Sequence, residues 1–112
     1  NANQQFGYMK HKKEYIIKPH LHKKRATKIF QTSEVILILK GVLRVDFYKL
    51  NKKYLFSKVL KKNDIIMLVN WGHGFKILKD VEMLEIKQGP YSLSKDKIKF
   101  NNISENKIKY KN

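Results

Sequence analysis

The densest apolar stretch of the chain runs from Ser33 to Tyr48 and is interrupted only by Lys40-Gly41. β-Branched, leucine and aromatic residues dominate on both sides of this interruption, and such residues favour extended strands. A glycine between two such runs is typical of a tight turn, so we predict a β-hairpin that turns at Lys40-Gly41. In its first half every residue of Val35–Leu39 is apolar. Both faces of that strand therefore need a covering layer.

Shorter runs of the same kind follow one another along the chain, separated by polar or glycine-containing turns. The predicted strands are 4–9, 19–22, 26–31, 54–60, 65–69, 75–78 and 81–88. The last two form a second hairpin, which turns at Lys79-Asp80. No long helical period interrupts this series. Many short strands with frequent turn signals are typical of an all-β sandwich or barrel.

Three histidines stand where strand geometry gives them a defined direction. His20 and His22 are two residues apart after Pro19, so they project from the same face if this segment is extended. His73 lies between two glycines in a sharp bend. Together with Glu34 at the start of the central stretch, they form a candidate site for Fe, Mn, Ni or Zn, because these ions accept imidazole and carboxylate ligands. The alternative is that the histidines only form hydrogen bonds or lie on the surface.

The last predicted strand allows two interpretations. Glu85 and Lys87 share one face, and Leu84 and Ile86 share the other. If Leu84 and Ile86 fill the core, the charged pair faces solvent. If the interior is a functional cavity, Glu85 and Lys87 line it, and Glu85 is a candidate catalytic acid or base. The same question applies to three residues of the central stretch: Arg44, Asp46 and Tyr48.

Length and composition limit the possible classes of protein. The 112 residues correspond to one domain, and the absence of cysteine excludes disulfides and thiolate metal sites. No apolar run approaches the roughly 20 residues of a membrane span. We therefore expect a cytoplasmic protein without membrane contact.

The net charge of +16 raises the question of nucleic acid binding. The lysines are spread along the chain in pairs, and there are only two arginines, Arg25 and Arg44, whereas base recognition depends largely on arginine. We interpret the charge mainly as a solvated basic surface. Nucleic acid binding is the less favoured alternative.

The composition divides the chain into three segments. Residues 1–12 are an N-terminal arm, whose first residues are candidates for the remnant of an expression tag. Residues 13–91 carry the strand pattern, and residues 92–112 are a basic C-terminal extension with isolated apolar positions. We also predict a homodimer, because the outer face of Val35–Leu39 needs a cover, which either a partner or the terminal segments can supply.

Several of these residues fall into the spacing of two known motifs. His20 and His22 form a His-x-His pair, and Glu34 is followed by six residues and Gly41. Further on, Asn63-Asp64 leads into an apolar strand that ends at the bend with His73. In these features the chain resembles the cupin superfamily of small jelly-roll β-barrels. Two features depart from the motifs, because the spacer between His22 and Glu34 is longer and the second motif lacks its proline.

The resemblance implies a single-domain cupin-type jelly-roll barrel over residues 13–91 that holds a small polar or anionic molecule. It also implies that a divalent metal at His20, His22, Glu34 and His73 is a natural cofactor for such a site. Some small bacterial cupins are associated with sugar-nucleotide pathways, so the ligand is expected to be sugar-related. Whether the protein is an enzyme stays open at this point. The enzyme alternatives are a sugar-nucleotide isomerase or epimerase, and a metal-dependent oxygenase.

Overall fold

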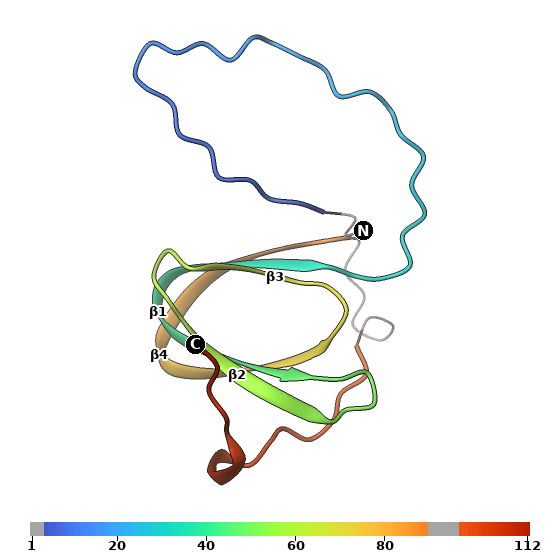
Figure 1. The fold of residues 1–112 in the computed structure, drawn as a ribbon, viewed down its shortest axis with the longest axis vertical. Helices are drawn as coiled ribbons and strands as arrows, with labels where there is room; N and C mark the ends of the chain where they lie inside the picture. Colours follow the sequence, from blue (N-terminus) through green and yellow to red (C-terminus); the bar gives the residue numbers. More distant parts are fainter. Residues whose placement is uncertain (1–3, 90–96) are drawn as a thin grey trace.

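A computed structural model describes residues 4–89 and 97–112 of the chain (Figure 1). Its strands are β1 (Glu34–Tyr48), β2 (Tyr54–Lys61), β3 (Ile65–Leu68) and β4 (Gly72–Lys87), all paired antiparallel to β1. One short 3-10 helix, η1 (Glu105–Lys107), follows. The all-β class is confirmed, whereas closure into a jelly-roll barrel stays a prediction. The possible tag residues and the boundary between the predicted barrel and the C-terminal extension lie partly outside the described residues.

The two long strands β1 and β4 pair with each other along almost their whole length. Both predicted hairpins are therefore wrong, because the chain does not reverse at Lys40-Gly41 or at Lys79-Asp80. At these positions the ladder shifts register instead, between Ile38 and Leu43 of β1. Gly41 has a φ of +84°, which lies in the left-handed region that glycine adopts without steric cost. The glycine thus bends the strand by a bulge, where we expected it to end the strand.

The bulge changes which side chains face the interior. Before it, the even-numbered residues Ile36 and Ile38 are buried in the core. After it, the odd-numbered residues Leu43 and Val45 are buried in the same core. An inserted residue in a strand has this effect because side chains alternate with a period of two. The bent β1 therefore presents an apolar face to a common interior from both halves, with β3 beside the first half and β2 beside the second.

Leu84 and Ile86 do not fill the core. They pair with Leu37 and Val35 of β1, on the face opposite to Ile36, and are 52% and 58% exposed. The interpretation in which these two residues pack inside the fold is therefore wrong. The physical reason is the register of the ladder, because residues paired across a sheet lie on the same face and the partners of Ile36 and Ile38 on β4 are Glu85 and Met83.

The three strands predicted before Glu34 are also wrong. Residues 4–33 form one wide loop that projects from the end of the sheet (Figure 1), and none of the described residues in it belongs to a strand. We call it the N-terminal loop. Its apolar alternation gives strand propensity, but a strand also needs a partner to satisfy its backbone, and this loop has none in the described chain.

The described end of the chain, residues 97–112, covers the outer face of β1 and β2, and we call it the C-terminal segment. Its backbone is bonded to β2, since Ser57 N donates to Lys109 O at 2.8 Å and Lys111 N donates to Ser57 O at 3.0 Å. The Tyr48 hydroxyl accepts a hydrogen bond from Ile103 N at 3.0 Å. Arg44 and Asp46 are consequently buried on the outer face and are not among the residues that line the cavity described below, whereas Tyr48, which is also buried, lies at the end of β1 and borders that cavity.

An ion cluster fastens the C-terminal segment to the sheet. The buried guanidinium of Arg44 donates to both carboxylate oxygens of Asp46, at 2.8 and 3.0 Å, and to both of Glu105, at 2.7 and 3.1 Å. Lys76 of β4 reaches Glu105 at 2.7 Å. These two cations lower the pKa of Glu105 to about 2, and Glu105 and Asp46 raise the pKa of Arg44 further. Bidentate pairing satisfies a charge that would be costly to bury alone.

Replacing Gly41 should destabilise the fold. A Cβ at this position meets the backbone carbonyl of Asp80, and the positive φ is unfavourable for any residue with a side chain. We expect Gly41→Ala to lower the free energy of unfolding by about 1–3 kcal/mol, measured by urea titration. Gly89→Ala is the matched control, because nothing lies within 4 Å of a Cβ there. An equal effect of both substitutions would contradict the bulge.

The attachment of the C-terminal segment should depend on pH. Because the pKa of Glu105 is lowered from 4.5 to about 2, its stabilising contribution is fully present above pH 4.5 and is lost as pH falls towards 2. Glu105→Gln should therefore lower the stability at pH 6, and the difference from the parent should shrink as pH approaches 2. Urea unfolding at a series of pH values measures this. Glu14→Gln, in the N-terminal loop, is the control, and a pH-independent difference for Glu105→Gln would contradict the ion cluster.

Candidate functional site

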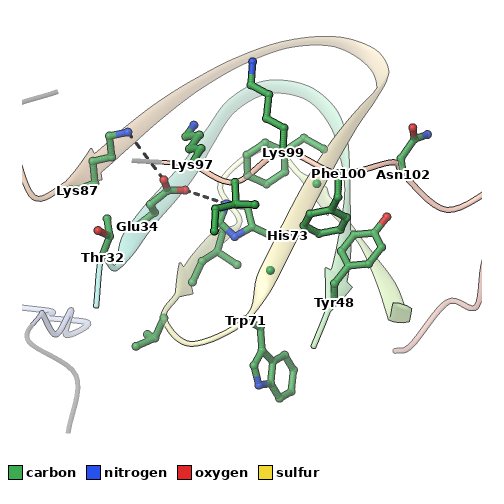
Figure 2. A pocket seen from close by; sticks show the side chains of 16 residues that line it. Thr32, Glu34, Tyr48, Trp71, His73, Lys87, Lys97, Lys99, Phe100 and Asn102 are labelled. Carbon is green, nitrogen blue, oxygen red and sulfur yellow. Dashed lines mark hydrogen bonds and ion pairs between the residues drawn. The ribbon is translucent and has the colours of Figure 1, made fainter. Parts of the chain in front are cut away.

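A cavity of about 480 Å³ lies where the two ends of the bent β1–β4 ladder approach each other, one end at Glu34 and Lys87 and the other at Tyr48 and Gly72. Figure 2 shows the side chains that line it, which come from β1, the β3–β4 connection, both ends of β4 and the C-terminal segment. The polar lining residues are Thr32, Glu34, Tyr48, His73, Lys87, Lys97, Lys99 and Asn102. The volume is in the range of small-molecule sites in proteins.

Glu34 and His73 form a hydrogen-bonded pair inside this cavity. His73 Nε2 lies 3.0 Å from Glu34 Oε2, and the Glu34 carboxylate is almost fully buried. Glu34 is the first residue of β1, on the same face as Ile36, and His73 is the second residue of β4. The bend of the two strands brings these distant positions together across the interior (Figure 2).

Lys87 completes the immediate surroundings of Glu34. It is the register partner of Glu34 in the β1–β4 ladder, so both side chains lie on the inner face, with Nζ 4.0 Å from Oε1. The pKa of Glu34 is lowered, chiefly by the hydrogen bond from His73, against burial, which raises it. The charges of His73, Lys97 and Lys87 lower it further. The carboxylate is therefore ionised at neutral pH despite its burial.

His73 has one further polar atom with no partner. Its Nδ1 is buried and makes no hydrogen bond. Every other buried side-chain nitrogen or oxygen in residues 4–89 and 97–112 has a hydrogen-bond partner. Buried polar groups are normally paired, and an exception often marks a place where a ligand or water binds. His73 thus offers a second nitrogen to whatever occupies the cavity, while its first nitrogen is held by Glu34.

Aromatic side chains form the apolar part of the cavity wall. Tyr48 and Phe100 meet edge to face with ring centroids 5.0 Å apart. Trp71 is half exposed and contacts Phe47 at 6.3 Å between centroids. The C-terminal segment therefore contributes an aromatic wall as well as two lysines, and the ion cluster at Arg44 holds that wall in place.

The predicted metal ligands are only partly brought together. Glu34 and His73 meet, but His20 and His22 lie in the exposed N-terminal loop with ring centroids 5.3 Å apart. Within the described residues no group of three or more His, Cys, Asp or Glu side chains is placed to hold a metal ion. Glu34 and His73 alone, already bonded to each other, do not make a metal site. Metal binding stays a prediction, because the four predicted ligands do not converge on one point in the described structure.

Glu85, the predicted catalytic residue, lies on the inner face opposite Ile36 but is exposed and is not among the residues that line the cavity. Its neighbour on that face, Lys87, does line it. Lys97, Lys99 and Phe100 escaped the sequence analysis. The sequence feature that could have identified them is the alternation of lysine with apolar residues over 97–100. This pattern is typical of an extended segment whose apolar side chains pack against the protein.

Comparisons with protein-family models, with curated proteins and with solved structures find no match to this chain. The resemblance to cupins therefore rests on the motif residues alone and stays a prediction. In the described part of the chain, no helix has the length and apolarity needed to cross a membrane.

The hydrogen bond between Glu34 and His73 can be tested by titration. We expect His73→Ala to raise the pKa of Glu34, because burial then opposes ionisation without the imidazole to favour it. Carbon NMR of the Glu34 carboxyl over a range of pH measures the change. His11→Ala, an exposed histidine of the N-terminal loop, is the matched control and should leave the titration unchanged. An unchanged midpoint in His73→Ala would mean that the pair does not form.

Proposed function

We propose that this protein binds a small anionic molecule, of the size of a sugar phosphate, in the cavity between the starts of β1 and β4. The observation that carries the proposal is the charge of the lining. Lys87, Lys97, Lys99 and His73 surround the cavity, and among the described lining residues Glu34 is the single carboxylate. A concave site with excess positive charge attracts anions and concentrates them.

The position of the carboxylate supports an anion that also carries hydroxyl groups. Glu34 is ionised and accepts hydrogen bonds, so it suits sugar hydroxyls, while the lysines suit a phosphate or carboxylate group. The aromatic wall at Trp71, Tyr48 and Phe100 suits the apolar face of a sugar ring. A ligand with both kinds of group uses the whole lining, whereas a bare inorganic anion uses only part of it.

Thermal unfolding with defined probes tests this proposal. Glucose 1-phosphate should raise the melting temperature of the parent more than either glucose or inorganic phosphate does at the same concentration. Ligand at a hundred times its Kd stabilises the folded state by about 2.7 kcal/mol. Lys87→Met and His73→Ala should abolish most of the shift, because they remove lining charge and a hydrogen-bonding nitrogen.

The control must account for the net charge of +16, which attracts any anion weakly. Lys53→Met removes the same charge from the loop between β1 and β2, away from the cavity lining. It should keep the full shift. Equal losses in Lys53→Met and Lys87→Met, or equal shifts with phosphate and glucose 1-phosphate, would contradict a specific site.

A second candidate function is proton transfer on the bound molecule, as in a sugar isomerase or epimerase. The observation that favours it is the hydrogen-bonded pair of Glu34 and His73, in which one group is held ionised beside an imidazole with a free nitrogen. Such pairs act as general acid and base. Incorporation of solvent deuterium at carbon in a probe that binds would support an enzyme, and binding without any exchange would support a binding protein.

A further inference from the structure

The N-terminal loop exposes far more apolar side chain than a loop of a single folded chain normally does. In residues 4–33 nine large apolar side chains are between 49% and 96% exposed: Phe6, Tyr8, Met9, Tyr15, Ile16, Ile17, Leu21, Ile29 and Phe30. Over the same described residues, one backbone-to-backbone hydrogen bond is made, from Tyr15 N to Lys12 O. An apolar segment of this length without secondary structure is uncommon inside a compact domain. Such a segment needs a surface to pack against.

The loop is fastened at its base and leads away from its own sheet. Ser33 is buried, its Oγ donates to Gln4 Oε1 at 2.9 Å, and its N donates to Gln88 Oε1 at 3.0 Å. These bonds bring both ends of the described loop to the end of β4. From there the loop projects outward, as Figure 1 shows in blue and cyan.

Strand β4 has exposed apolar side chains and an unpaired edge, against which such a segment can pack. Phe75, Ile77 and Met83 of β4 face the interior, because they pair with buried residues of β1, yet they are 37%, 49% and 37% exposed. Their partners on β1 are fully buried. In the described part of the chain, β4 pairs with β1 alone, so its second edge carries no strand. The cover that the core lacks therefore belongs along β4.

Charge favours the same match. Residues 4–32 contain eight basic side chains and one acidic one. On β4, the segment 80–86 contains three of the nine acidic residues of the chain, Asp80, Glu82 and Glu85, and no basic residue. All three are exposed. A basic segment that lies along this part of β4 gains opposite charges as well as apolar contacts.

From these observations we infer that two copies of this chain exchange their N-terminal loops, so that the loop of each copy lies along the free edge of β4 of the other. A second copy is the occupant because the loop and the open edge occur on every chain, and the loop leads away from its own β4. The exchange covers the open side of each core and forms a symmetric dimer. This inference does not depend on the proposed ligand.

Thiol cross-linking between copies tests the inference directly, since the chain has no cysteine of its own. One batch carries Leu21→Cys in the loop and the other carries Leu84→Cys on β4. The batches are mixed, partly unfolded and refolded together, and treated with a short bismaleimide. We expect a product of twice the chain mass that contains one copy of each variant. Leu50→Cys, on another strongly exposed leucine outside the N-terminal loop, replaces Leu21→Cys as the control and should give little product.

Sedimentation of the parent at micromolar concentration should give a dimer. Leu21→Asp should weaken the dimer by about tenfold or more, because it removes one buried apolar contact and places a negative charge near the acidic edge. Leu50→Asp should leave it unchanged. A monomeric parent would overturn the inference, and so would a dimer in which Leu21→Cys and Leu84→Cys do not cross-link. Efficient cross-linking within one chain that carries both cysteines would also overturn it, because the loop would then lie on its own sheet.

Discussion

The structure depends on one backbone constraint, the bulge that places Gly41 against the carbonyl of Asp80. Without the inserted residue, the even-numbered side chains of β1 would stay on one face throughout. Ile36 and Ile38 would then lie inside while Leu43 and Val45 lay outside. The bulge bends the strand and reverses the alternation together, so one strand contributes to the core from two directions. Only a residue without a side chain can come this close to the Asp80 carbonyl, which explains why position 41 is a glycine.

The same reversal produces the candidate site. Glu34 belongs to the first half of β1 and His73 pairs with the second half, and they meet because the halves face each other. The reversal also turns Arg44 and Asp46 to the outer face, where they bind Glu105 of the C-terminal segment. That ion cluster holds Phe100 and the lysines of the segment at the cavity. An ion cluster on the outer face of the sheet therefore holds one wall of the pocket in place.

Charge acts differently in the separate regions of this basic protein. At the cavity, positive side chains surround a single carboxylate and keep it ionised. At the ion cluster, the carboxylates of Asp46 and Glu105 satisfy a buried arginine. Along β4, three acidic residues gather in a chain that otherwise has few. The net charge alone identifies none of these arrangements, since each depends on which residues the fold places side by side.

Residue types alone predicted the all-β class and the central stretch around β1, because strand propensity is a local property. They also singled out Glu34 and His73 as candidate site residues, which the fold joins by a hydrogen bond. The sequence also marked Lys40-Gly41 as a place of unusual backbone. That this glycine bends a strand and does not end it depends on the pairing of β1 with β4, since a turn and a bulge both favour glycine. In the described chain the apolar residues before Ser33 find no partner and form no strand. The register of β4 turns Leu84 and Ile86 outward. Lys97, Lys99 and Phe100 reach the cavity through the packing of the C-terminal segment. These outcomes depend on register and on contacts between residues far apart in the chain, which local patterns do not specify.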